Sequence, residues 1–165
     1  MKKLFLAALM ALPLTAFAQK FAHVNTMEIL QQMPEFTKAQ TELQALSQQK
    51  EDELKRMQDE LNAKVEDYEK NQATMPDAVR QNREQELNEI NNRLRTYYET
   101  SQQELNQVQQ KKMEEITTKI TAVIKEIGEA GGYVYIMDVT SGIPFINEKL
   151  SEDVTAKVKA KLGLK

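Results

Sequence analysis

The chain has no cysteine, no tryptophan and a single histidine among its 165 residues. The absence of cysteine excludes a disulfide framework, a cysteine-ligated zinc site and a thiol nucleophile. One histidine cannot supply two imidazole ligands to a metal, and it makes a Ser-His-Asp relay hard to build. Bases are also in the minority, with 22 Lys and Arg against 25 Asp and Glu, whereas nucleic-acid binders usually show a basic face. These absences favour a protein that is not an enzyme, needs no cofactor or metal and binds no nucleic acid.

Glycine and proline are scarce, at 5 and 4 residues, and the middle of the chain has almost none. Between Glu35 and Ile127 there is no glycine, and the one proline is Pro76. The mean hydropathy is low, at −0.60, because the many polar residues are mostly Gln, Glu and Lys, which are good helix formers. We therefore expect two long helices, roughly Glu35 to Gln72 and Ala78 to Ile127, joined by a turn at 73–77.

Residues 1–18 have the layout of a Sec signal peptide. The positive start Lys2-Lys3 precedes an apolar run from Leu4 to Leu12, and Ala16-Phe17-Ala18 offers the small residues of a cleavage site. The apolar run is too short to span a bilayer, which takes roughly 20 apolar residues. Because Gln19 and not cysteine follows, we expect cleavage after Ala18 without a lipid anchor, and a periplasmic protein that is still more acidic once the two lysines are removed.

Apolar residues recur along both helices at steps of three, four and four. Such a repeat averages about 3.67 residues per turn, close to the natural period of the α-helix, and so favours a nearly straight coiled pair. Folding back at Pro76 pairs Leu46 with Leu105 and Leu61 with Ile90. The expected seam of this hairpin consists of Leu46, Leu54, Met57, Leu61, Ile90, Leu94 and Leu105.

Two polar residues, Lys50 and Ser101, interrupt this repeat in the middle of the hairpin, and the same register sets them opposite each other. We expect a weak polar layer there, and with it a flexing point. Tyr98 falls on the repeat and is expected in the seam, whereas Tyr97 lies off it and Met75 lies in the turn. Because aromatic side chains and soft methionine suit adaptable binding surfaces, Met75 and Tyr97 are the candidate contacts for a partner.

Short segments with strand character lie on either side of the helical middle. Phe21 to Asn25 is expected to form a first strand and to lead into a short helix from Met27 to Met33. Gly131-Gly132 is expected to end the second long helix. Tyr133 to Asp138, rich in β-branched and aromatic residues, is expected to form a second strand.

The last segments are expected to complete a small body. Ile143 to Ile146 reads as an edge strand because it contains Pro144. Ser151 is expected to cap a final helix that has Glu152 and Asp153 in its first turn, as the helix dipole favours. So few residues bury too little surface to be stable alone, and unpaired strand edges promote association. We therefore expect the strands to assemble between subunits.

In order and spacing, these segments resemble the OmpH/Skp family of periplasmic chaperones. The likeness covers the whole chain. It rests on the signal peptide, the stretch Phe21 to Leu30 with Pro34 after it, the long charged hairpin, the strand Tyr133 to Asp138 and the closing stretch Leu150 to Val158. The pattern Asp-Val-Thr-x-x-Val at the end of that stretch is similar to the family's characteristic close.

The resemblance implies an α+β fold that is mostly α, with a long antiparallel helical hairpin projecting from a small β-containing trimerisation body. Residues 43–109 would form the coiled-coil arm with its tip at 73–77, and 19–42 with 110–165 would form the β-barrel body with the helix roots. A jellyfish-shaped homotrimer of this kind is implied to hold unfolded outer-membrane β-barrel proteins between its arms without ATP. It would prevent their aggregation and deliver them for outer-membrane assembly.

One departure from the family concerns charge, because its best-known members are strongly basic and this chain is acidic. Between Asn62 and Glu89, at the tip, acids outnumber bases. This argues against a lipopolysaccharide site and predicts client binding that depends only mildly on salt. Stable membrane insertion is not expected either, because no stretch after residue 18 is apolar enough to cross a membrane. A structural coiled-coil adaptor of the cell envelope, with one defined partner, would use the same hairpin and stays an alternative.

Overall fold

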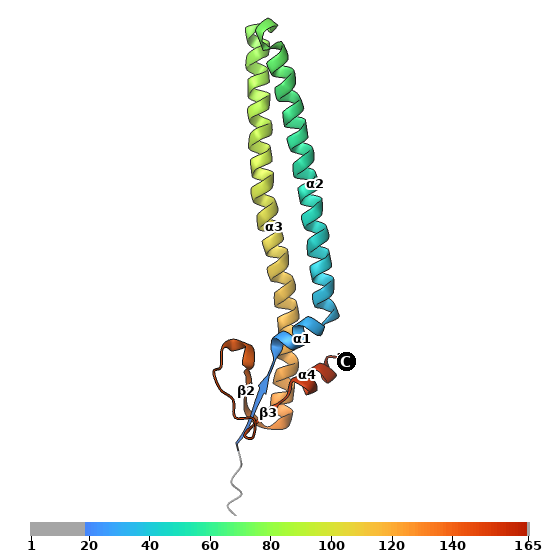
Figure 1. Cartoon of the computed structure of the whole chain (residues 1–165), viewed down its shortest axis with the longest axis vertical. Coiled ribbons are helices and arrows are strands. Elements are labelled where there is room, and N and C mark those ends of the chain that lie inside the picture. Colours follow the sequence, from blue (N-terminus) through green and yellow to red (C-terminus); the bar gives the residue numbers. More distant parts are fainter. Residues whose placement is uncertain (1–18, 165) are drawn as a thin grey trace, which may run out of the picture. The chain divides into compact units, whose positions relative to one another are not determined.

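The computed structural model describes residues 19–164, so the predicted signal peptide, residues 1–18, lies outside the described residues. Within them a strand and two helices precede a tip, and a third helix, two strands and a last helix follow it (Figure 1). In order, the elements are β1 (Lys20–Val24), α1 (Thr26–Gln32), α2 (Pro34–Asn71), α3 (Asp77–Gly131), β2 (Tyr133–Asp138), β3 (Ser151–Asp153) and α4 (Thr155–Lys161). Short 3₁₀ turns, η2 (Gln72–Thr74) and η3 (Val139–Ser141), follow α2 and β2.

The chain divides into two compact units. The first, called the arm here, comprises Met27–Thr121 and contains α2 and most of α3. The second, called the body, combines β1 with Ala122–Gly163. Residues 27–42 and 110–121, which the sequence-based division assigned to the body with its helix roots, are grouped with the arm here.

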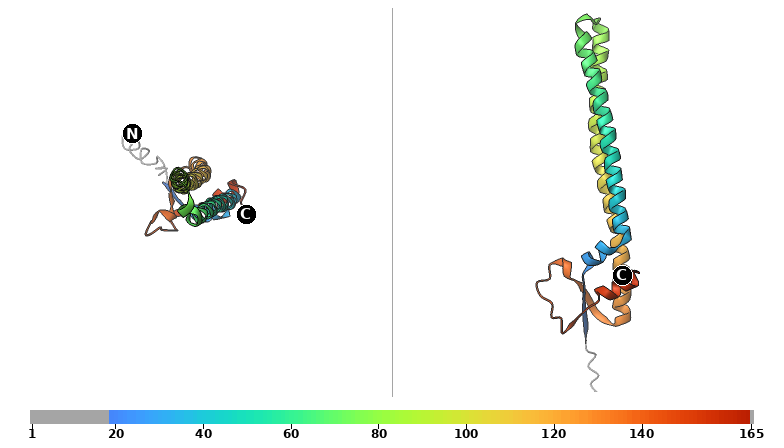
Figure 2. Two further views of the ribbon diagram at one scale, coloured as in Figure 1. Left: turned by 90° about the horizontal axis from the view of Figure 1, so that it is seen from above. Right: turned by 45° about the vertical axis from the view of Figure 1, so that its right-hand side comes forward.

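In the arm, α2 and α3 run antiparallel and side by side, as two views agree (Figures 1 and 2). Pro34 occupies the first turn of α2, where a missing N–H costs nothing, and Met33 before it is extended, as residues preceding proline prefer. At the tip, Met75 is extended before Pro76, and α3 then begins at Asp77. The two long helices therefore lie close to their predicted bounds.

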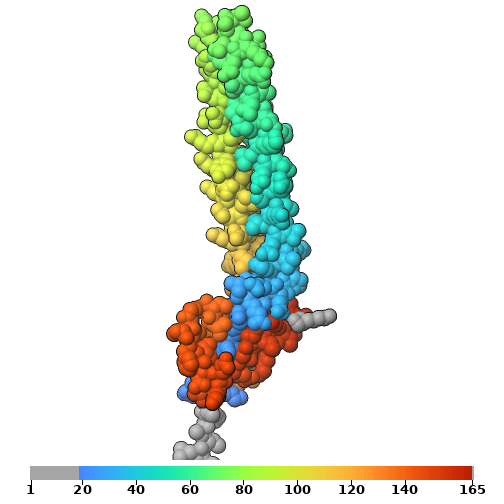
Figure 3. All heavy atoms as spheres, in the orientation of Figure 1, coloured from blue at the N-terminus to red at the C-terminus, as the bar shows by residue number. Residues whose placement is uncertain are grey.

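Cross-helix ion pairs give the register of the hairpin. Lys50 Nζ lies 2.6 Å from Glu104 Oε2, and Lys112 Nζ lies 2.7 Å from Glu42 Oε2. In both pairs the α3 residue lies three positions further along the chain than the residue that the predicted pairing of Leu46 with Leu105 places opposite. Figure 3 shows the side chains of the two helices meeting along the hairpin.

The body contains a three-stranded parallel sheet in the order β2-β1-β3. Ala22 and Val24 on β1 are fully buried, whereas Phe21 and His23, which alternate with them, are half-buried, so the strand turns one face inward. Val158 of α4 is also fully buried. Gly128 of α3 approaches β2 closely, since a Cβ built on it would lie 3.5 Å from the side chain of Ile136.

The C-terminal part of the prediction was partly wrong. Residues 143–146 form no regular structure, and the third strand is instead β3, whose Ser151 pairs with Phe21 and whose Asp153 pairs with His23. Ser151 therefore does not cap the last helix. The carboxylate of Asp153 accepts a hydrogen bond of 2.8 Å from the backbone N–H of Thr155, where α4 begins.

The short helix α1 offers a direct test of the buried side chains near the start of the chain. Ile29 is fully buried and Met27 on the same helix is 50% exposed. We expect Ile29→Ala to lower the free energy of unfolding by about 2–5 kcal/mol, because it leaves a cavity. Met27→Ala, the matched control, should change it by less than about 0.5 kcal/mol. Urea denaturation followed by circular dichroism at one protein concentration measures both, and equal losses would contradict this account.

Candidate functional site

Large apolar side chains are exposed on the body. Phe145 is 78% exposed and Leu150 is 71% exposed, and Val134, Tyr135 and Met137 of β2 are exposed as well. Single exposed apolar residues are ordinary in soluble proteins, but a group of them gathered on one small unit marks an interaction surface. This group is called the apolar body surface below.

Part of this surface surrounds a hollow next to the sheet. The rings of Phe21 on β1 and Tyr135 on β2 pack with their centroids 4.9 Å apart. The segment between β2 and β3 completes the lining, which consists of Phe21, Tyr135, Met137, Ile143, Phe145, Ile146, Asn147, Leu150 and Ser151. Ile143, Phe145 and Ile146, from the segment that the sequence predicted to be a strand, therefore line this hollow from an irregular segment.

Asp138, at the end of β2, connects that strand to the start of α1. Its carboxylate accepts hydrogen bonds from the Thr26 hydroxyl at 2.6 Å and from the backbone N–H and the hydroxyl of Thr140 at 3.0 and 2.8 Å. Burial raises the pKa of Asp138, but the hydrogen bonds from Thr26 and Thr140 outweigh it and hold that pKa below its ordinary value. The bond with Thr140 is local, whereas Thr26 lies 112 residues away along the chain, so no sequence motif predicted that contact.

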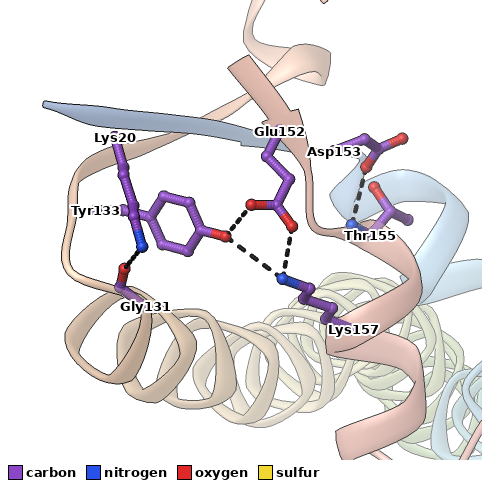
Figure 4. A network of polar contacts seen from close by, with 7 residues as sticks. All are labelled: Lys20, Gly131, Tyr133, Glu152, Asp153, Thr155 and Lys157. Atoms are coloured by element: carbon purple, nitrogen blue, oxygen red, sulfur yellow. Dashed lines mark hydrogen bonds and ion pairs between the residues drawn. The ribbon is translucent and has the colours of Figure 1, made fainter. Parts of the chain in front are cut away.

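A second polar network fastens β3 and α4 to the start of β2 (Figure 4). The Tyr133 hydroxyl donates to one oxygen of Glu152, and Lys157 Nζ lies 2.5 Å from the other. The ion pair with Lys157 and the hydrogen bond from Tyr133 lower the pKa of the Glu152 carboxyl. Lys20 Nζ donates to the carbonyl oxygen of Gly131 at 3.3 Å, which ties β1 to the end of α3. These charges are paired within the body.

His23, the single histidine, has a structural partner. Its Nδ1 lies 2.9 Å from the Ser151 hydroxyl oxygen, across the β1–β3 pair. The neighbouring acid on β3, Asp153, is bonded to the Thr155 backbone. The hydrogen bond between His23 and Ser151 therefore links β1 to β3.

In the arm, the seven predicted seam residues all lie on covered faces of the helices. Met57 and Ile90 are buried, and the others are half-buried, namely Leu46, Leu54, Leu61, Leu94 and Leu105. Further toward the body, Ile116 and Ile120 of α3 are buried too. The apolar repeat thus marks the inner stripe of each helix.

A polar layer interrupts the seam where the sequence predicted one. Ser101 is only 2% exposed, and its hydroxyl oxygen is the one buried side-chain polar atom without a hydrogen-bond partner among the described residues. The Lys50 side chain is 16% exposed, and its ammonium lies 5.6 Å from the centre of the Tyr97 ring. The hydrogen bond from Lys50 to Glu104 raises the pKa of Lys50. That the arm flexes here stays a prediction.

The tyrosine assignment differs from the sequence-based one. Tyr98, expected in the seam, is 53% exposed, while Tyr97 is half-buried against Lys50. Between them the helix turns by about 100°, so a small shift in the phase of the repeat exchanges the two positions. Met75 at the tip is half-buried.

Two features often linked to function do not occur among residues 19–164. No described helix is both long and apolar enough to cross a membrane. In the same residues, no group of three or more His, Asp or Glu side chains is arranged to hold a metal ion.

Comparisons with known proteins agree on one family. The family described as outer membrane protein (OmpH-like) matches residues 20–162. The chain is 26% identical to chaperone protein Skp of Yersinia enterocolitica over 162 residues, covering 96% of this chain and 97% of that protein. It is 28% identical to chaperone protein Skp of Photorhabdus luminescens over 163 residues, with the same coverage. A crystal structure of an OmpH-like outer membrane chaperone from Caulobacter crescentus is similar in fold, with a TM-score of 0.74 at 15% identity, covering 87% of this chain and 83% of that one.

The lowered pKa of Asp138 gives a pH test of the body. A carboxylate whose folded pKa is depressed adds stability above its unfolded pKa, and that stability is lost as the pH falls through the folded value. We expect Asp138→Asn to lower the free energy of unfolding by about 1–3 kcal/mol at pH 7. The difference from the parent should shrink below about pH 4. Urea titrations at pH 7 and pH 3 measure it, with the exposed Glu148→Gln as control; a difference that persists at pH 3 would contradict this view.

Proposed function

The chain belongs to the OmpH-like family of outer membrane proteins, and from this premise we propose that it is an ATP-independent periplasmic holdase chaperone. In this proposal it binds unfolded outer-membrane β-barrel proteins between helical arms, keeps them from aggregating and delivers them for outer-membrane assembly. The observation that carries the proposal is the family match over residues 20–162 combined with a hairpin arm and a small body. The predicted signal peptide supports the periplasmic location.

The apolar body surface supports a homotrimer as the working form. Exposed Phe145 and Leu150, together with the outer side chains of β2, need a cover, and other copies of the same small body can supply it. Both β2 and β3 are edge strands, and unpaired edges favour association. Three bodies joined in this way would hold three arms around a common space.

The arm suits weak binding of an extended chain. Its exposed large apolar side chains among the described residues are isolated ones, Met27, Val79 and Tyr98. Many weak contacts spread over several arms retain a client through effective concentration and still release it in steps. Met75 and Tyr97 stay the proposed client contacts, and the exposure of Tyr98 adds it to them.

A structural coiled-coil adaptor of the envelope remains the second candidate, because the same hairpin could span a distance to one defined partner. The apolar body surface is compatible with both, but family membership favours the chaperone. The two differ in a simple observable, since an adaptor has no reason to suppress the aggregation of unrelated unfolded barrels.

We expect the mature chain to suppress the light scattering of an unfolded outer-membrane β-barrel protein diluted from urea. Suppression should be complete near one trimer per client and need no ATP, because binding energy alone retains the client. Light scattering measures the aggregation, and mass photometry of the same sample gives the oligomeric state, expected at three subunits.

Two sets of variants sharpen this test. Met75→Ala and Tyr97→Ala should weaken protection without changing the mass, whereas Leu150→Asp, on the apolar body surface, should reduce the mass to that of a single chain. Asn62→Ala, an exposed polar change on α2, is the control and should behave as the parent. A trimer without protection would favour the adaptor, and protection by a monomer would contradict the proposed cage.

Client binding should depend only mildly on salt. The arm is rich in acids, and several near the tip are already paired, as Glu86 is with Lys64 and Arg83. Few uncompensated bases are left to attract an acidic client, so apolar contacts should dominate. Fluorescence titration of a labelled client at 50 and 500 mM NaCl should change the Kd by less than about threefold. A loss of tenfold or more would show that ionic attraction carries the binding.

A further inference from the structure

Ion pairs join α2 to α3 at intervals along the hairpin. Glu35 pairs with Lys119 and Glu42 with Lys112, so near the body α2 supplies acids and α3 supplies bases. At Lys50 the order reverses, because here the base is on α2 and its partner Glu104 is on α3. Beyond it, toward the tip, Glu60 faces Arg93 and Lys64 contacts Glu86.

The apolar seam by itself specifies this register weakly. Its positions recur every three or four residues on both helices, so a slip of one helical turn moves most apolar positions onto other apolar ones. The tip constrains the register little, because residues 72–74 form only a short 3₁₀ turn and are all exposed. A further specifying element is therefore needed to select one pairing.

The charged groups, unlike the apolar ones, distinguish the native register from a register slipped by one turn. A slip of one turn in either direction would carry Lys50 from Glu104 to a place beside an uncharged residue of α3. In one of the two directions the same slip would set Glu60 against Glu89, two like charges. Lys50 is largely covered, with 16% of its side chain exposed, so its ammonium would lose its partner while still partly desolvated.

Buried Ser101 supports the same interpretation. An unpartnered hydroxyl in an apolar seam costs stability, and an alanine there would not. Polar groups at single seam positions of coiled coils are known to specify register at such a cost.

We propose that Lys50, Glu104 and Ser101 form a register lock that selects one pairing of α2 with α3 at the expense of stability. The lock fixes which side chains of the two helices share a face, and so it defines the surface that the arm presents. The proposal does not depend on the chaperone function, and it concerns the isolated chain as well as any assembly.

The natural absence of cysteine allows the register to be read by disulfide cross-linking. Ala63 and Leu87 line one hollow between the helices, so Ala63→Cys with Leu87→Cys reports the native register. Ala63→Cys with Asn91→Cys, and Asp59→Cys with Leu87→Cys, report slips of one turn in the two directions. Cross-links within one chain leave its mass on a non-reducing gel unchanged, which separates them from links between copies.

Each cysteine pair is placed in the parent and in a Lys50→Leu/Ser101→Ala background. In the parent the native pair should cross-link at least about tenfold faster than either slipped pair. In the apolar background the slipped pairs should approach the native rate, while the Tm of that background without cysteines rises by about 2–4 °C. Slipped pairs that stay slow in the apolar background, or that are already fast in the parent, overturn the proposal.

A charge exchange tests the lock even if the apolar background folds poorly. Lys50→Glu alone should accelerate the slipped cross-links, because two acids then face each other across the seam. Lys50→Glu with Glu104→Lys restores an opposite pair and should return the slipped cross-links to the parent's slow rate. If the slipped cross-links stay fast in the double exchange, the tip and not these residues selects the register, and the lock is contradicted.

Discussion

The pairing of β1 on both sides is the constraint on which the rest of the body depends. β1 lies at the start of the described chain, and both of its partners, β2 and β3, come after the long helices. A parallel sheet of this kind forms only if the chain leaves the body, returns and then crosses to the other side of β1. The hairpin is that return path, and Asp138 secures its beginning by binding Thr26 at the start of α1.

The sequence predicted the arm well and the body less well, for physical reasons. A repeat carried through two long helices averages out local exceptions, so it locates the covered face of each helix to within about one residue, as the exchange of Tyr97 and Tyr98 shows. β3 was missed because its three residues are polar and are held by backbone pairing with β1, which has no side-chain signature. Residues 143–146 were expected to form a strand, but the side chains of Ile143, Phe145 and Ile146 line a hollow. The contact of Asp138 with Thr26 joins distant parts of the chain, so no local pattern predicts it.

The body and the arm have different kinds of surface. The body gathers exposed apolar side chains close together, as Phe145 and Leu150 show, and apolar area of that density suits a permanent contact. The arm is polar, with paired charges and isolated apolar groups, and this suits contacts that form and break. The family to which the chain belongs includes relatives described as chaperones, and the proposed function would use the body for a lasting contact and the arm for a reversible one.

The central place of β1 in the sheet also sets the order in which the helices and the sheet form during folding. Chains are synthesised from the N-terminus, so β1 is made before α2 and α3 and stays unpaired until both helices have been made. Helices form from local contacts in microseconds, whereas pairing between distant segments is slow. The hairpin therefore shortens the search by bringing β2 back toward β1. A protein proposed to shelter unfinished β-sheets is thus one whose own sheet is finished last.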